Sequence, residues 1–278
     1  MRKEDARRRL QKLRKSVPTA PLPKKEDTPE WLYTIEDMRG FFDTASEVWD
    51  DVFGPDEDRI GLDMYDAVAR EIEATDAPIR LLVPGCGTGL ELEGLFERAP
   101  NARVKGIDLS GGMLAKLREK FRSRAAQIEL LENSYVDLPL GKSVYDYAIA
   151  TLTAHHLSPD AKSRFYAAVR AALKPGGKYI EGDQSSSPED EAKTLKCFAD
   201  YIAGLPGGDR AEWNYDVTLC PETNERLLRE AGFNDVKLTW KSRSGGNVVL
   251  VADPDAAKPT GRLCLEAQAP RTYRTRFP

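Results

Sequence analysis

The sequence contains few of the residues that most often carry disulfide, metal or redox chemistry. It has four cysteines and two histidines among 278 residues. The cysteines are widely separated and form no Cys-x-x-Cys pair, which indicates reduced thiols and not a disulfide framework or a zinc site. No constellation of metal ligands stands out in the sequence. We therefore expect no bound metal.

Long apolar runs are also missing. No segment approaches the roughly 18 consecutive apolar residues that a membrane helix needs. The first residues, "MRKEDARRRLQKLRKS", lack the apolar core of a signal peptide. With 41% hydrophobic and 31% charged residues, the composition is that of a globular protein with one sizeable core. We expect a cytoplasmic protein.

Positive charge is outnumbered by negative charge over the chain beyond the N-terminus. The first 25 residues hold ten Lys or Arg and two acidic residues, although the net charge of the chain is −4. The remaining acidic body disfavours a general nucleic-acid binder. The basic arm, which ends in a Pro-rich linker at residues 17–29, is typical of a solvated helix. It is also compatible with a contact to RNA, an anionic membrane or another subunit, and the oligomeric state stays open.

Apolar periodicity predicts a helical cap over residues 30–77 and an α/β core over 78–253. The cap contains an amphipathic helix at 34–53, which starts near Thr34 and Asp37, and a second at 58–74. In the core, buried strands alternate with helices. The predicted strands are 79–85, 102–110, 127–133, 144–153 and 176–183, and the helices between them are 90–99, 111–125 and 159–173. This order implies a doubly wound parallel sheet with its ligand crevice at the carboxyl ends of the strands.

The end of the core has a different pattern. A helix at 221–233 precedes two strands within 235–253, joined through Ser-Gly-Gly. The predicted sheet is thus mostly parallel and seven-stranded, and it ends in an antiparallel hairpin. Residues 184–219 form an insertion that suits a lid, and residues 254–278 form an extended tail.

The stretch "LLVPGCGTGLEL" at 81–92 places three glycines between a strand and a helix, which is the position for a cofactor. A dinucleotide fingerprint needs glycine where Leu90 stands, and a phosphate-binding loop needs Gly-Lys-Ser/Thr, which is absent. The following helix opens with Glu91 and Glu93, whose charges disfavour a pyrophosphate. The turn favours a cofactor without phosphate and is compatible with a cationic one.

"LLVPGCGTG" resembles the first motif of class I S-adenosylmethionine-dependent methyltransferases. "GIDLSGGML", "ENSYVDLPL", "YDYAIATLTAHHL", "LKPGGKYIEGD" and "LLREAGF" resemble later motifs of the same family in the same order, over roughly residues 40–252. The His-His-Leu in the fourth strand segment is similar to small-molecule methyltransferases of the quinone-biosynthesis kind. The resemblance implies the Rossmann-like methyltransferase fold and S-adenosylmethionine as the cofactor.

The resemblance also implies roles for residues at the strand ends. Asp108 would accept hydrogen bonds from the ribose hydroxyls, and Leu109 and Met113 would flank the adenine, although core packing explains them equally well. Ser134 stands where family members often carry an Asp that reaches the adenine amino group, so this contact would fall to Ser134 or to the backbone at Tyr135. The other expected donor contacts are Tyr33, Gly85, Cys86, Gly87 and Thr151.

His155 and His156 are candidates for proton acceptance from the nucleophile, or they pack beneath the lid without a catalytic role. Asp183 is a candidate to orient the substrate, or it caps the following helix. Methyl transfer needs little acid–base chemistry because positioning supplies much of the rate.

We expect transfer to a small-molecule acceptor, and the aromatic residues of the cap and the insertion suit a flat one. The alternatives are an RNA or protein methyltransferase guided by the basic arm, and a protein that binds S-adenosylmethionine without catalysis. An NAD-dependent oxidoreductase is disfavoured by the glycine turn, and base N-methylation by the lack of an Asn/Asp-Pro-Pro motif.

Overall fold

The computed structural model describes residues 1–22, 33–54 and 62–257. Its main feature is a seven-stranded sheet with the order β5-β4-β3-β6-β7-β9-β8. Strands β3 to β7 are parallel to one another, and β9 runs antiparallel to both β7 and β8. This confirms the predicted mostly parallel sheet with an antiparallel end. The strands are β3 (Arg80–Pro84), β4 (Arg103–Asp108), β5 (Ile128–Glu132), β6 (Tyr145–Thr151), β7 (Leu173–Gln184), β8 (Asp235–Lys241) and β9 (Asn247–Asp253).

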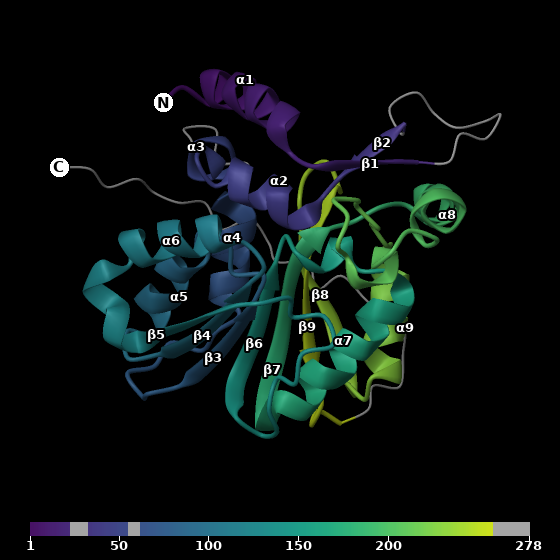
Figure 1. Cartoon of the computed structure of the whole chain (residues 1–278). Helices are drawn as coiled ribbons and strands as arrows, with labels where there is room; N and C mark the ends of the chain where they lie inside the picture. Colours follow the sequence, from purple (N-terminus) through teal and green to yellow (C-terminus); the bar gives the residue numbers. More distant parts are fainter. Residues whose placement is uncertain (23–32, 55–61, 258–278) are drawn as a thin grey trace.

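Helices cover both faces of this sheet (Figure 1). One layer contains α4 (Leu62–Arg70), α5 (Leu92–Arg98) and α6 (Gly111–Lys120), and the other contains α7 (Pro159–Ala172) and α9 (Pro221–Glu230). Successive strand residues point to opposite faces, so Leu81 and Val83 of β3 pack in the first layer and Leu82 packs in the second. Burial on both faces explains why these strands read as continuous apolar runs.

The N-terminal segment lies across the end of the sheet where the parallel strands finish (Figure 1). It contains α1 (Lys3–Leu13), β1 (Thr19–Pro21), β2 (Thr34–Glu36), α2 (Met38–Ala45) and α3 (Trp49–Phe53). The single helix predicted over 34–53 is wrong, because residues 34–36 pair antiparallel with 19–21. Asp37 caps α2 by accepting a hydrogen bond from the Gly40 N–H at 2.6 Å. Within the predicted linker, residues 19–21 thus form a strand.

The basic arm is a helix with one apolar face packed against the cap. Ala6 is fully buried in a cluster with Val48 and Val52, and Leu10 and Leu13 pack against it. Arg9 pairs with Glu47 at 2.6 Å and Arg14 pairs with Glu36 at 2.7 Å. Both arginines are about half exposed, so each pair contributes little. Burial of Ala6 and partial burial of Leu10 and Leu13 therefore hold the arm against the cap.

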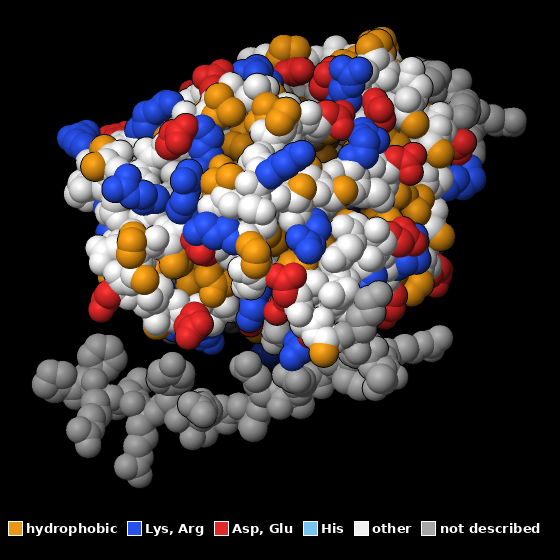
Figure 2. All heavy atoms as spheres, turned by 90° about the horizontal axis from the view of Figure 1, so that it is seen from below, with side chains coloured by type: hydrophobic (Ala, Val, Ile, Leu, Met, Phe, Trp, Pro, Cys, Tyr) orange, Lys and Arg blue, Asp and Glu red, His pale blue; other side chains and the backbone are white. Residues whose placement is uncertain are grey.

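The insertion after β7 contains α8 (Pro188–Cys197), one turn of π-helix (Phe198–Ile202) and a short 3₁₀ turn (Gly208–Arg210). Tyr201 and Ile202 are buried against Leu22 and Ile35 of the N-terminal segment. The surface seen from the opposite end of the sheet carries Lys, Arg, Asp and Glu side chains interspersed with small apolar areas (Figure 2). None of the helices in the described ranges is long and apolar enough to cross a membrane. Most of the 254–278 tail lies outside those ranges.

Substitution of Gly85 tests how closely the turn after β3 packs against its neighbours. A methyl group there would lie 2.0 Å from Thr153 Oγ1, in a backbone with φ of +64°. Gly176 has a similar φ of +76°, but a methyl group added to it would meet nothing within 4 Å. We expect Gly176→Ala to cost about 1–2 kcal/mol from the left-handed backbone alone. Gly85→Ala should cost roughly 1–3 kcal/mol more from overpacking. Urea unfolding of both variants measures the difference, and equal costs would contradict the tight contact.

Candidate functional site

The glycine turn links β3 to α5 in a left-handed backbone. Gly85, Gly87 and Gly89 have φ values of +64°, +48° and +72°, which side-chain-bearing residues rarely adopt. A Cβ at Gly87 would meet nothing within 4 Å, and Gly87 lines the main pocket of the described residues. The turn therefore leaves open space where a ligand can approach the backbone.

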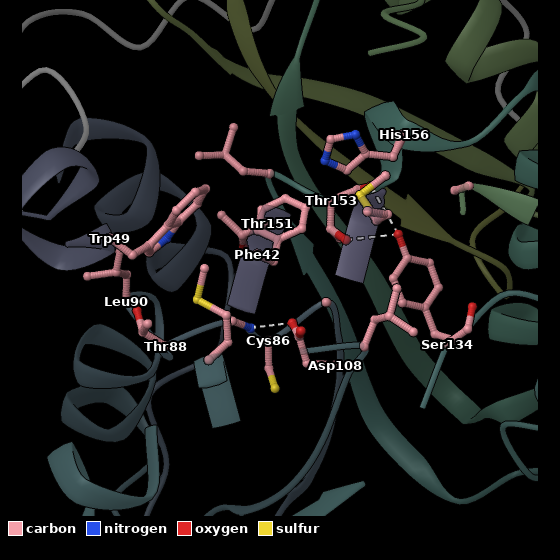
Figure 3. A pocket seen from close by; sticks show the side chains of 18 of the residues that line it. Phe42, Trp49, Cys86, Thr88, Leu90, Asp108, Ser134, Thr151, Thr153 and His156 are labelled. Carbon is pink, nitrogen blue, oxygen red and sulfur yellow. Dashed lines mark hydrogen bonds between the residues drawn. The ribbon is translucent and has the colours of Figure 1, made fainter. Parts of the chain in front are cut away.

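Asp108 ends β4 beside this turn. Its Oδ2 accepts a hydrogen bond from the Gly87 N–H at 2.8 Å, drawn as the dashed line that ends on Asp108 in Figure 3. Its Oδ1 accepts one from the Ser110 N–H at 2.9 Å. Burial raises the pKa of the Asp108 carboxyl, and these backbone hydrogen bonds oppose the rise. A carboxylate has about four lone-pair sites, so acceptor capacity remains for hydroxyl groups of a ligand.

The pocket gathers most of the residues that the sequence indicated for the donor. The predicted donor residues that line it are Gly85, Cys86, Gly87, Asp108, Leu109, Met113, Ser134, Tyr135 and Thr151. Tyr33 is not among the lining residues, is 41% exposed and precedes β2. Burial raises the pKa of the Cys86 thiol well above its ordinary value, which fits a packing role and not a nucleophile.

Ser134 and Tyr135 form the wall that follows β5. The Ser134 hydroxyl accepts a hydrogen bond from the Val136 N–H at 3.2 Å, and the Tyr135 hydroxyl donates to the Thr153 carbonyl at 2.9 Å. The Tyr135 hydroxyl is thus already engaged with the segment after β6. The Ser134 hydroxyl proton keeps no partner among these contacts and can serve a ligand.

Two residues at the end of β6, Thr151 and Leu152, also line this pocket. The Thr151 Oγ1 atom is buried and has no hydrogen-bond partner within the described part of the chain. Leu152 adopts a left-handed backbone with φ of +49°, which is uncommon for a branched side chain and costs free energy. A buried hydroxyl without a partner is expected to meet one when a ligand enters.

A second carboxylate, which the donor-residue prediction did not include, lines the same pocket. Glu91 is 5% exposed, and burial raises its pKa to about 7. The neighbouring Thr88 hydroxyl donates to Asp50, which also pairs with Lys120 at 2.6 Å. The only signal in the sequence was the position of Glu91 at the opening of the helix after the turn. This side chain can provide negative charge to a cationic ligand.

The cap supplies an aromatic wall to the same pocket. Phe42 of α2 and Trp49 of α3 line the pocket and contact each other edge to face at 5.4 Å between ring centroids. Phe42 also contacts the His156 ring at 5.6 Å. Figure 3 shows Trp49, Phe42 and His156 around the pocket on the side away from Asp108. The sequence indicated aromatic residues in the cap but not which of them reach the site.

The three predicted catalytic residues divide into two groups. His156 lines the pocket, whereas His155 and Asp183 do not. Asp183 is 1% exposed, and its Oδ1 lies 2.5 Å from His155 Nδ1. Burial alone would lower the pKa of His155, but the charge and hydrogen bond of Asp183 raise it overall. Burial and the neighbouring His155 lower the pKa of His156 to about 4, so its imidazole is neutral near pH 7.

The sequence and the fold are similar to those of known methyltransferases. A methyltransferase domain family matches residues 82–177. The ubiquinone/menaquinone biosynthesis C-methyltransferase of Syntrophotalea carbinolica is 29% identical over 195 residues, which cover 66% of this chain and 79% of that protein. The demethylmenaquinone methyltransferase of Thermus thermophilus is 24% identical over 176 residues, which cover 60% and 79%. The fold is similar to human N-acetylserotonin methyltransferase solved with SAM, with a TM-score of 0.54 and 15% identity over 78% of this chain and 57% of that one.

The pocket geometry also fits the expected cofactor. The open backbone at Gly87, the spare acceptor capacity of Asp108 and the unpartnered Thr151 hydroxyl offer contacts for a nucleoside with an amino acid end. The matched domain and the relatives support a class I S-adenosylmethionine-dependent methyltransferase with S-adenosylmethionine as its cofactor.

Proposed function

We propose that this protein transfers the methyl group of S-adenosylmethionine to a small-molecule acceptor by direct in-line displacement. One observation carries the proposal: a single pocket joins the glycine turn and Asp108 to an aromatic wall that contains Phe42, Trp49 and His156. Residues from the sheet, the cap and the lid insertion surround this pocket. Such an enclosed site suits a small acceptor better than a polymer.

The polar groups of the pocket indicate where the methyl donor would bind. Asp108 would hold the ribose hydroxyls, and Ser134 and Tyr135 would border the adenine. Glu91 would face the ammonium group of the amino acid end, near the Thr151 hydroxyl. The bound cofactor supplies an activated sulfonium methyl group. The protein then needs only to hold the nucleophile in line with it, and such positioning lowers a barrier by about 7–11 kcal/mol in well-oriented reactions.

The acceptor half has the character of a site for a flat ring. Phe42 and Trp49 present aromatic surface, and the neutral His156 imidazole can hydrogen-bond a hydroxyl or carbonyl. The relatives named for ubiquinone and menaquinone synthesis support a ring acceptor with oxygen substituents. In this proposal His156 contacts the acceptor, and His155 and Asp183 act only through the position of His156.

Asp108 provides the first test of the donor site. Replacing it with Asn removes the charge but keeps one acceptor, and charge-assisted hydrogen bonds contribute about 1.5–3 kcal/mol. We therefore expect Asp108→Asn to weaken S-adenosylmethionine binding by roughly ten- to a hundredfold in titration calorimetry. Glu132→Gln, at the paired position on β5 and outside the pocket lining, should bind as the wild type does. Equal affinity of both variants, or tighter binding of NAD by the wild type, would overturn the donor assignment.

Transfer itself is tested by mass spectrometry of reaction mixtures with phenols, hydroquinones and quinone-ring acids. A methylated product that forms with the wild type and is reduced in Asp108→Asn supports the proposal. Donor binding without product across the panel would instead favour a protein that binds S-adenosylmethionine without catalysis.

Glu91 makes donor binding depend on pH. Because its pKa is raised to about 7, the carboxyl is mostly neutral at pH 6 and mostly charged at pH 8. The affinity for the cationic donor should therefore rise between about pH 6 and pH 8, by at most tenfold per pH unit for one coupled proton. Glu91→Gln should bind with little pH dependence over this range. A wild-type affinity that stays constant with pH would contradict contact between Glu91 and the donor.

The alternative of a polymer substrate guided by the basic arm can be separated from this proposal. Arg7, Lys12 and Lys15 are exposed on or just after α1, so replacing all three with Gln leaves the packed face of the helix intact. We expect small-molecule methylation to change less than about twofold, because surface substitutions of this kind have small effects. If the wild type methylates an anionic polymer, and the triple variant loses that activity but regains it at low salt, the polymer would be the favoured substrate.

A further inference from the structure

Three ligating atoms from two distant parts of the chain converge beside the acceptor end of the pocket. They are His155 Nε2 and His156 Nδ1, which follow β6, and Asp216 Oδ1, from the segment before α9. The carboxylate oxygen lies 3.6 Å from His155 Nε2 and 3.4 Å from His156 Nδ1. All three atoms lie within 4.8 Å of one another.

The distances from Asp216 Oδ1 to the two histidine nitrogens match those between neighbouring ligands of a metal ion. An N–H···O hydrogen bond typically has a heavy-atom distance of about 2.7–3.2 Å, so both gaps to Asp216 are too long for good hydrogen bonds. Zinc–nitrogen and zinc–oxygen bonds of about 2.0–2.2 Å in a tetrahedral site place adjacent ligands roughly 3.4 Å apart. Asp216 Oδ1 is thus spaced from each histidine nitrogen as neighbouring ligands of a small ion are, and the two nitrogens lie within 4.8 Å of each other.

Asp183 orients His155 as a second layer of residues does around a metal. Its Oδ1 lies 2.5 Å from His155 Nδ1, and its Oδ2 accepts the His155 backbone N–H at 2.9 Å. A carboxylate on Nδ1 fixes the protonated nitrogen and leaves Nε2 with a lone pair, which is the usual arrangement of a metal-binding histidine. Nε2 is the atom that faces Asp216.

The charge of the cluster also favours a cation. Asp183 and Asp216 bring two carboxylates to the histidine pair, and the Asp183 side chain is only 2% exposed. A proton on His155 Nε2 would offset one of these charges. A divalent ion at the same nitrogen would offset both, and buried charges are stable only when they are paired or coordinate metals.

We propose that His155, His156 and Asp216 bind a divalent transition-metal ion of the zinc type, with water completing its coordination. This replaces the expectation of no metal, which the sequence favoured because Asp216 is 60 positions from His156. Such an ion ties the segment before α9 to the end of β6, where the Val217 N–H already donates to the His155 carbonyl at 2.5 Å. The ion would lie beside the pocket, because its ligand His156 lines the pocket wall. Binding of the ion does not depend on the identity of the methyl acceptor.

The test uses the full chain without a histidine tag, treated with chelator and titrated with Zn²⁺ or Co²⁺. We expect one ion per chain by calorimetry and elemental analysis, and a cobalt absorption spectrum typical of a four-coordinate site. Asp216→Asn should weaken binding at least about tenfold, and Asp183→Asn by roughly 10–100-fold, the usual effect of losing an outer partner. Asp209→Asn, an exposed acid on the same insertion, should bind the ion as the wild type does.

Asp216 is half exposed, at 51% of its side-chain surface, so its replacement should leave the metal-free melting temperature unchanged. The proposal fails if the wild type binds no stoichiometric ion. In that case a proton on His155 Nε2, and not an ion, would offset the charge of one carboxylate. It also fails if Asp216→Asn and Asp209→Asn bind equally well, because the ion would then lie elsewhere. A rise in melting temperature with Zn²⁺ that is lost in Asp216→Asn supports the proposed tie between the two segments.

Discussion

The site depends on the hydrogen bond between the Asp108 carboxylate and the Gly87 N–H. This contact joins the turn after β3 to the end of the neighbouring strand β4, so two segments about twenty residues apart form one wall. Within this left-handed turn the Gly87 N–H donates to the Asp108 carboxylate, and the Gly85 N–H donates to the Ile107 carbonyl at 2.7 Å. Without glycine at these positions, the chain could not keep both the close packing against Thr153 and the open space at Gly87.

The pocket beside the glycine turn is lined by two acidic side chains. Asp108 and Glu91 are both largely removed from water, and burial raises the pKa of each. A carboxylate in such surroundings interacts more strongly with a positive ligand than an exposed one does, because less water screens the charge. This charge pattern explains why the turn suits a sulfonium nucleoside, whereas a pyrophosphate would be repelled.

Apart from His156, the side of the pocket that we propose for the acceptor is built by parts of the chain outside the matched residues 82–177. Phe42 and Trp49 come from the cap, and Arg210 and Ala211 come from the lid insertion. Packing of α1 against Val48 and Val52 supports the helix that carries Trp49. The basic arm, which the sequence left without a clear role, therefore contributes to the shape of the acceptor pocket through its buried apolar face.

The sequence by itself determined the order of strands and helices in the core, because runs buried on both faces read as strands. It also indicated most of the residues at the strand ends and in the glycine turn that line one pocket, although Tyr33 does not line it. Only the tertiary structure decided the acceptor side. Thr34–Glu36 forms a strand because Thr19–Pro21 lies beside it, and Asp216 meets the histidines because the lid insertion folds back over β6. Periodicity reports which side chains are buried but not which distant segment covers them, and so these contacts could be found only in the folded chain.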